Sequence, residues 1–130
     1  MTSWEGLNRR RFPRVKYPCL VTAWYESEEE NDKEIFLTHT ENIGTGGCAI
    51  ICHKRFKLFS SVALEIDLLD MEEHIHCKAK VVWVVQRKDP DVRRPVVYDI
   101  GVEFQEVREE DARRISKIIQ RLSQHPGNLA

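Results

Sequence analysis

Apolar and polar residues alternate with a period of two along most of the chain, which is the pattern of half-buried β-strands. The alternation is regular in residues 62–68, where Val62, Leu64 and Ile66 would share one face and Glu65 and Asp67 the other. Five further segments are rich in β-branched and aromatic residues and are bounded by turn residues: 17–25, 34–41, 48–52, 74–86 and 95–104. The pattern therefore predicts six short strands.

The segment 74–86 has the longest alternation, and one of its faces would carry Cys77, Ala79, Val81, Trp83 and Val85. We therefore expect Trp83 to belong to the core, and the same holds for Trp24 in segment 17–25. Gly101, inside the last predicted strand, is expected to mark a bulge or a close approach of two backbones.

After residue 108 the period becomes that of an amphipathic helix. One apolar stripe at i, i+3, i+4 and i+7 is formed by Ile115, Ile118, Ile119 and Leu122. Three acidic residues in the first turn suit the helix dipole, and Pro126 with Gly127 ends the pattern. The sequence thus predicts an all-β fold with a C-terminal α-helix: a small six-stranded antiparallel β-barrel on which helix 109–124 packs.

Length and composition fit a single domain with its own core, at 130 residues, 42% hydrophobic and 32% charged. No segment approaches the roughly 18 apolar residues of a membrane helix. The N-terminus also lacks the apolar segment of a signal peptide, so we expect a cytoplasmic protein without membrane insertion. The four cysteines lie in apolar segments, which favours free buried thiols over disulfides.

Positive charge gathers near the N-terminus, although 20 lysines and arginines nearly balance 21 aspartates and glutamates. Residues 9–14 read RRRFPR, and Pro13 biases Phe12 to an extended conformation. We therefore expect a basic arm over residues 1–16, followed by the barrel and helix over residues 17–124. Arginine grips phosphate with a planar fork and stacks on flat rings, so such an arm suits a ligand with phosphates and bases.

A glycine-rich stretch, NIGTGG at residues 42–47, is the second candidate for chemistry. Its three glycines allow backbone N–H groups to approach whatever lies over the turn. The Asn42 amide can donate and accept hydrogen bonds with a donor–acceptor edge of a ligand. Two predicted strands and a loop separate Arg14 from Asn42, and a hairpin of that size would return Asn42 to a position beside the arm.

These features resemble the PilZ domain family, whose pattern is an RxxxR pair, a (D/N)xSxxG turn, a six-stranded barrel and a C-terminal helix. The resemblance spans roughly residues 9–122. It includes the stretches KAKVVWV and DIGVEF of this chain, which look like the family's late strands. It implies a bacterial receptor for cyclic di-GMP, in which Arg10 and Arg14 stack on guanine and contact phosphate. It also implies that Asn42 and Gly47 belong to the binding turn, with Arg9 and Arg11 as weaker contacts.

One position departs from the family pattern. Gly44 stands where the motif has serine, and placing Thr45 there instead would put Ile43 and Cys48 at the other motif positions. The missing hydroxyl corresponds to about one hydrogen bond, near 1 kcal/mol.

We therefore expect a non-enzymatic domain that needs no cofactor, takes cyclic di-GMP as its ligand and signals through an unidentified protein partner. One alternative is a degenerate PilZ-like module that makes protein contacts without binding the nucleotide. Another is a basic arm that touches anions without selectivity. A barrel for single-stranded nucleic acid is disfavoured because the tryptophans are scattered. No catalytic group stands out in the sequence. The histidines and cysteines that come nearest to a metal site lack the tight spacing of structural zinc ligands: His74 and His76 on one strand face, and Cys48, Cys52 and His53.

Overall fold

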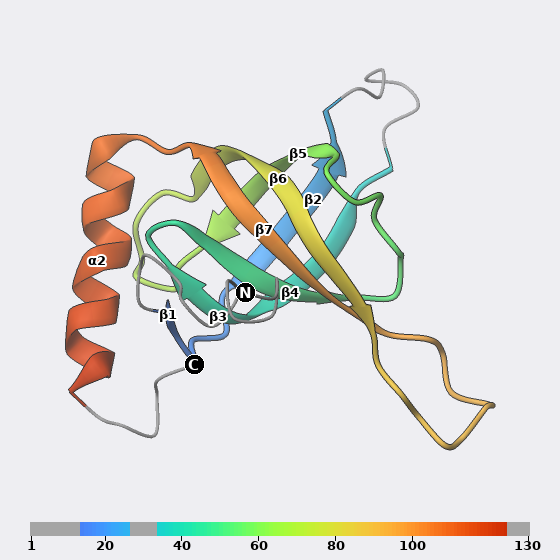
Figure 1. Cartoon of the computed structure of the whole chain (residues 1–130). Helices are drawn as coiled ribbons and strands as arrows, with labels where there is room; N and C mark the ends of the chain where they lie inside the picture. The colour runs from blue at the N-terminus through green and yellow to red at the C-terminus, as the bar shows by residue number, and fades with distance from the viewer. Residues whose placement is uncertain (1–13, 27–33, 125–130) are drawn as a thin grey trace, which may run out of the picture.

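The computed structural model describes residues 14–26 and 34–124, which form seven β-strands and one α-helix (Figure 1). The elements are β1 (Arg14–Val15), β2 (Leu20–Tyr25), β3 (Phe36–Gly44), β4 (Gly47–Cys52), β5 (Ser61–Asp67), β6 (Ile75–Gln86), β7 (Tyr98–Glu106) and α2 (Glu109–Ser123). Strands β2 to β7 pair antiparallel in the order β3-β2-β5-β6-β7-β4, and β4 pairs back with β3. The predicted six-stranded barrel with a C-terminal helix is therefore confirmed.

Strand β1 is a short additional strand on β3. Arg14 pairs with Gly44 and Val15 pairs with Ile43, both antiparallel. These two residues fall within the segment predicted as an arm, yet they belong to the sheet, and the Val15 side chain is fully buried.

Proline explains two strand boundaries that differ from the predicted ones. Residues 17–19 precede β2 and residues 95–97 precede β7, whereas both segments were predicted as strand. Pro18 and Pro95 lie in these segments and have no N–H to donate to a neighbouring strand. At the other end, helix α2 stops at Ser123, and Gln124 is its C-cap.

Alternate residues of β2, β5 and the first half of β6 fill the barrel interior, as the period of two requires. Strand β5 shows this most regularly, with Val62, Leu64 and Ile66 at most 1% exposed. The connector between β4 and β5 contributes Phe56, whose ring contacts the rings of Tyr25 and Phe36 at centroid distances of 5.1 and 5.2 Å. The basic connector is thus anchored to the core by one aromatic side chain.

A bulge in β6 corrects the prediction that Trp83 and Val85 share a face with Val81. The register shifts between Val81, which pairs with Val102, and Trp83, which pairs with Gly101. The extra residue places the following side chains on the opposite face of the strand from the one that strict alternation predicts. Val81 is fully buried, whereas Val85 is 54% exposed, and Val84 packs against the core instead.

All four cysteines are free and buried, as predicted. Burial raises the pKa of the Cys19 thiol to about 11 and that of the Cys77 thiol to about 12. Cys48, which is fully enclosed, has a pKa raised further by burial. These thiols are therefore protonated at neutral pH, which suits a packing role.

Helix α2 stands beside the barrel and contacts β1 and β3 (Figure 1). It buries Asp111, Ile115 and Ile119 on one face, in agreement with the predicted apolar stripe apart from the acid. The connection between β6 and β7 projects from the opposite end of the molecule (Figure 1). Within the described ranges, no helix is long and apolar enough to cross a membrane.

Candidate functional site

Strand β1 places Arg14 beside the glycine-rich turn. Arg14 lies opposite Gly44 in the sheet register, and its Nη1 donates a hydrogen bond to Oδ1 of Asn42 at 3.4 Å. The three residues were predicted as ligand contacts from separate parts of the sequence. The structure brings Arg14 and Asn42, both half-buried, together beside the buried Gly44.

A buried threonine fixes the chain that leads from β1 into β2. The Thr40 hydroxyl accepts a hydrogen bond from the backbone N–H of Cys19 at 2.8 Å and donates one to the Tyr17 carbonyl at 2.6 Å. The Thr40 side chain is 1% exposed, so water competes little for these bonds. They hold the residues after Arg14 against β3 and so help to keep Arg14 near Asn42.

A second bulge, in β3, sets the direction of the Asn42 side chain. Thr40 pairs with Ile50 and Asn42 pairs with Ala49, so Glu41 is an extra residue in this strand. Thr40 and Ile43 are buried, whereas Glu41 and Asn42 are half-buried. The bulge therefore lets two successive side chains face outward, and Asn42 is one of them.

The turn itself is shorter than the predicted one. Residues 42–44 belong to β3 and Gly47 begins β4, which leaves only Thr45 and Gly46 outside the strands. None of the described glycines has a positive φ. A side chain at Gly47 would place its Cβ 2.2 Å from the carbonyl oxygen of Val102, so glycine is needed there for close packing of β4 against β7.

An ion cluster lies next to Asn42, and no local sequence pattern predicted it. The Arg87 Nε atom donates to both oxygens of Asp99, at 2.9 and 3.0 Å, and its Nη2 atom pairs with Glu41. Burial raises the pKa of the Glu41 carboxyl, and the neighbouring Asp99 raises it further, while Arg87 opposes both effects. The cluster joins the bulge in β3 to the ends of β6 and β7.

Four strands form a row of residues that ends in an indole ring. Asn42 pairs with Ala49, Ala49 with Gly101, and Gly101 with Trp83. A Cβ at Gly101 would lie 2.1 Å from the ring of Trp83, so the indole rests directly on this glycine. Gly101 therefore lies opposite the bulge in β6, and the close approach at this glycine is made by the Trp83 ring and not by a second backbone, as had been predicted.

The row carries three groups that suit a planar anionic ligand: an amide, a guanidinium and an aromatic ring. Asn42 and Arg14 supply an amide and a guanidinium at one end, and Trp83 supplies a half-buried aromatic surface at the other. Ala49 and Gly101 lie between them in the row, and both are buried, with the Trp83 ring resting on Gly101. Trp83 was missed as a site residue because alternation alone assigned it to the core.

The structure does not describe the remaining predicted contacts. Arg9, Arg10 and Arg11 lie outside the described residues, so their roles stay predictions. Within the described ranges, no group of three or more histidine, cysteine or carboxylate side chains could hold a metal ion.

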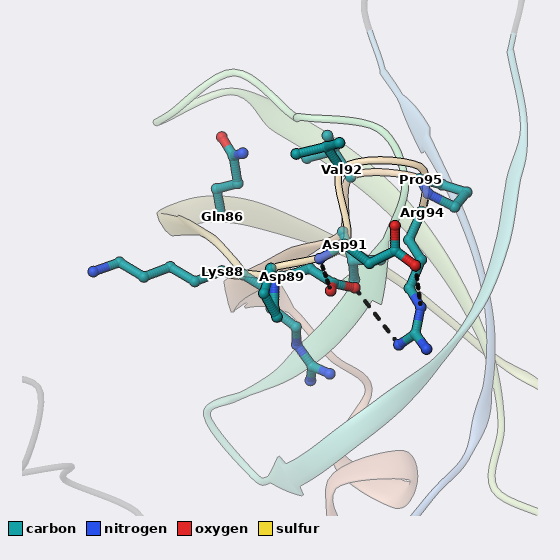
Figure 2. Close-up of a pocket in the computed structure, with 11 residues that line it drawn as sticks. Gln86, Lys88, Asp89, Asp91, Val92, Arg94 and Pro95 are labelled. Carbon is teal, nitrogen blue, oxygen red and sulfur yellow. Dashed lines mark hydrogen bonds and ion pairs between the residues drawn. The ribbon is translucent and has the colours of Figure 1, made fainter.

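A separate hollow of ≈ 1150 Å³ lies in the connection between β6 and β7 (Figure 2). Among its lining side chains, Arg94 pairs with Asp89 and Asp91, and Asp91 also pairs with the neighbouring Arg93. These ion pairs are exposed and hold the connection in shape, and none of the predicted ligand contacts lines the hollow.

A sequence model of the PilZ domain matches residues 8–121 of this chain. The chain belongs to the PilZ domain family. The match confirms the predicted family and includes both the arginine-rich segment and the turn at residues 42–47. Comparison with curated proteins gives no match.

Solved PilZ structures share the fold. The PilZ domain of YcgR from Escherichia coli with c-di-GMP has a TM-score of 0.65 at 17% identity, over 91% of this chain and 94% of that one. MotI/DgrA, the inhibitor of motility of Bacillus subtilis, gives 0.65 at 21% identity, over 90% of this chain and 53% of that one. The K. pneumonia MrkH–c-di-GMP complex gives 0.68 at 22% identity, over 92% and 53%. This PilZ chain thus spans about half the length of the last two proteins.

Proposed function

We propose that this PilZ domain is a cyclic di-GMP receptor that signals through protein contacts and has no catalytic role. The main support is that β1 places Arg14 opposite Gly44 and in hydrogen-bond contact with Asn42. Two residue types suited to a nucleotide, an arginine fork and an amide, thereby meet at one place on the barrel surface. The related domains of YcgR and MrkH were solved with c-di-GMP, which supports the same ligand class here.

In this proposal the ligand-binding arm over residues 1–16 joins the sheet through β1 near its end, and residues 17–124 form the rest of the barrel and the helix. Arg10 and Arg14 hold the nucleotide by stacking and by charge-assisted hydrogen bonds, with weaker help from Arg9 and Arg11. Asn42 reads a base edge. Gly44 and Gly47 keep the turn low enough for the ligand to lie over it.

Trp83 extends the same surface. Its half-buried indole lies in the row that starts at Asn42, and in this proposal a guanine bound between Asn42 and the indole stacks on the exposed part of the ring. Base–aromatic stacking contributes about 1–3 kcal/mol per base. Removing the indole should therefore weaken binding without removing charge from the site.

A second candidate function is a PilZ module that makes protein contacts without binding the nucleotide. The observation in its favour is Gly44, which lacks the hydroxyl of the motif serine. The loss of one hydrogen bond, about 1 kcal/mol, lowers affinity several-fold but does not remove the arginine contacts. The first function is therefore the better supported.

Isothermal titration of the full chain with cyclic di-GMP tests the proposal. We expect saturable binding that Arg14→Lys weakens, while a short single-stranded RNA binds poorly. Arg113→Lys is the matched control, because Arg113 is 66% exposed on α2 and pairs only with Glu109 among described residues. An absence of binding heat with wild-type protein would favour the second function. Equal binding of both ligands would favour an unselective basic arm.

A further inference from the structure

The turn between β5 and β6 exposes two large apolar side chains. Leu69 is 52% exposed and Met71 is 101% exposed. Both have positive φ, 59° for Leu69 and 65° for Met71, a backbone region that L-residues with bulky side chains rarely adopt. Such a conformation persists only where surrounding contacts enforce it, and it is found mainly at functional sites.

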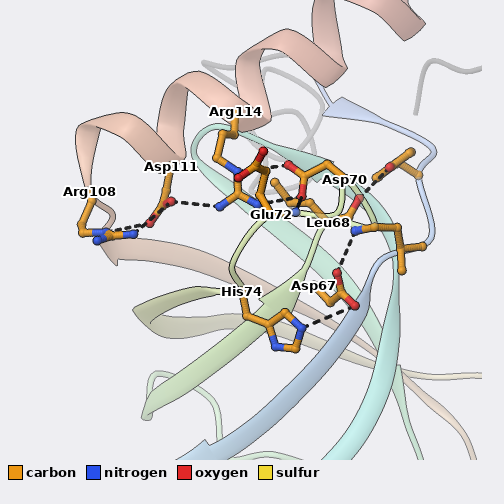
Figure 3. A network of polar contacts seen from close by, with 10 residues as sticks. Asp67, Leu68, Asp70, Glu72, His74, Arg108, Asp111 and Arg114 are labelled. Atoms are coloured by element: carbon orange, nitrogen blue, oxygen red, sulfur yellow. Dashed lines mark hydrogen bonds and ion pairs between the residues drawn. The ribbon is translucent and has the colours of Figure 1, made fainter.

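Several hydrogen bonds enforce the shape of this turn, and Figure 3 shows the polar network around it. The Tyr17 hydroxyl donates to the Leu68 carbonyl at 2.7 Å. The backbone N–H of Leu69 donates to Asp67 at 2.9 Å, and that of Glu72 donates to Asp70 at 3.1 Å. Each of the two carboxylates thus holds a backbone group two residues further along the chain.

The turn is also tied to helix α2. Arg114 donates to both oxygens of Asp70, at 2.8 and 3.0 Å, and to the buried Asp111 at 3.2 Å. Asp111 in turn accepts from Arg108 at 3.0 Å. The exposed side chains of Leu69 and Met71 are therefore presented by a backbone that is fixed from two sides. A surface ordered in advance loses less entropy when a partner binds.

Leu69, Glu72 and Glu73 share a hollow with basic residues at and along α2, of which Arg108 and Arg114 are paired with Asp111 and Asp70: Arg108, Arg114, Lys117 and Arg121. On the turn itself the exposed charges are negative, since Glu72 and Glu73 form no ion pair with a described residue. Their charge disfavours an anionic lipid surface or a nucleic acid, because both carry the same sign. A complementary partner has basic groups around an apolar depression.

We propose that residues 68–73 form a protein-docking surface. Leu69 and Met71 enter an apolar depression on a partner protein, and Glu72 and Glu73 pair with lysine or arginine side chains at its rim. This inference goes beyond the proposed function and does not require nucleotide binding. Tyr17, which holds the turn, follows β1 by two residues, so the docking surface and the candidate ligand site share one stretch of chain.

Site-specific photo-crosslinking in the cells that naturally produce the chain tests this. Met71→p-benzoylphenylalanine is compared with the same replacement of Val92, which is 94% exposed on the connection between β6 and β7. We expect an adduct with one protein from position 71 only. Its crosslinked peptide, mapped by mass spectrometry, should contain apolar residues flanked by lysine or arginine.

A second experiment reverses the charges at Glu72 and Glu73. Adding Glu72→Lys and Glu73→Lys should lower the yield of that adduct by about tenfold or more, because like charges would then face each other. Adding Glu72→Asp and Glu73→Asp should largely keep it. Equal adducts from positions 71 and 92, a yield unchanged by charge reversal, or a crosslink to lipid, nucleic acid or a second copy would each overturn the proposal.

Thermal unfolding and cyclic di-GMP titration of the same purified variants keep the two proposals separate. We expect the variants at positions 71–73 to unfold like wild type and to bind the nucleotide equally well. A chain that fails to bind cyclic di-GMP but still gives the specific adduct would refute the receptor function alone. A chain that binds the nucleotide without giving the adduct would refute the docking surface alone.

Discussion

The guanidinium of Arg14 donates to the amide oxygen of Asn42 at 3.4 Å, although the two residues are 28 positions apart in the sequence. The contact exists because β1 pairs with the end of β3, directly before the turn at Thr45 and Gly46. Asn42 therefore orients the arginine fork before any ligand arrives. An orientation fixed in advance makes the geometry of the guanidinium, and not only its charge, important.

We expect Arg14→Lys to weaken cyclic di-GMP binding by roughly 2–4 kcal/mol, nearly as much as Arg14→Ala. Lysine keeps the positive charge but loses the fork and the flat face. Arg10→Lys should have a similar effect, and Arg11→Ala a smaller one. Isothermal titration measures all of these. Lysine variants that bind as wild type does would show that charge alone matters.

Gly44→Ser restores the motif hydroxyl and should strengthen nucleotide binding by up to about 1 kcal/mol. Because none of the described glycines has a positive φ, serine meets no backbone strain at this position. Gly44 is buried opposite Arg14, so the new side chain must fit beside the arginine. Titration of a normally folded variant decides: weaker binding would mean that the hydroxyl displaces Arg14.

The contact of Trp83 with Gly101 can be tested by a double-mutant cycle. Gly101→Ala would place a methyl group 2.1 Å from the indole, so we expect a loss of about 1–3 kcal/mol in the free energy of unfolding. In a Trp83→Ala background the same change should cost much less, since the clashing ring is gone. Urea denaturation measures both values.

Gly47→Ala is the matched control for this cycle. Its new methyl group would meet the backbone carbonyl of Val102 at 2.2 Å, which no side-chain truncation relieves. Trp83→Ala should therefore leave the cost of Gly47→Ala unchanged. Additive effects of Gly101→Ala and Trp83→Ala would show that the indole does not rest on this glycine.

Trp83 shows why alternation alone cannot predict every side-chain position in this fold. Alternation predicts a strand well when each apolar residue has polar neighbours, as in β5. Residues 81–85 read VVWVV, an unbroken apolar run in which nothing marks the bulge before Trp83. A one-residue insertion reverses the faces without changing the composition, so the half-buried position of the Trp83 ring could not be predicted.

One part of the candidate site could likewise be predicted from the sequence, and another part could not. The meeting of Arg14 and Asn42 could be expected, because a hairpin of suitable length separates them. The cluster of Glu41, Arg87 and Asp99 depends on which strands are neighbours, with β4 between β3 and β7. No local pattern gives that order, since each of the three residues alone reads as an ordinary surface charge.

Glycine at the strained positions gives a further prediction. Leu69→Gly and Met71→Gly should leave the free energy of unfolding unchanged or raise it slightly. Glycine adopts a positive φ without the cost of roughly 1–2 kcal/mol that an L-residue bears, which offsets its greater freedom in the unfolded chain. Gly replacement of Val85 in β6 is the control and should destabilise. Urea denaturation checks the three variants, and a clear loss at positions 69 and 71 would contradict the strain argument.

The ion pair between Asp70 and Arg114 predicts how stability depends on pH. Hydrogen bonds from Arg114 are the main reason that the pKa of Asp70 lies below its ordinary value. A carboxylate whose pKa is lowered by folding stabilises the protein fully above its unfolded pKa, near 3.9. That contribution disappears as the pH falls from there through the folded pKa. Unfolding free energies measured by urea denaturation between about pH 5 and about pH 2.5 should therefore decline more steeply for wild type than for Asp70→Asn. Glu72→Gln, which removes a neighbouring exposed carboxylate, should follow the wild-type curve, and an equal decline in all three proteins would exclude Asp70 as the titrating group.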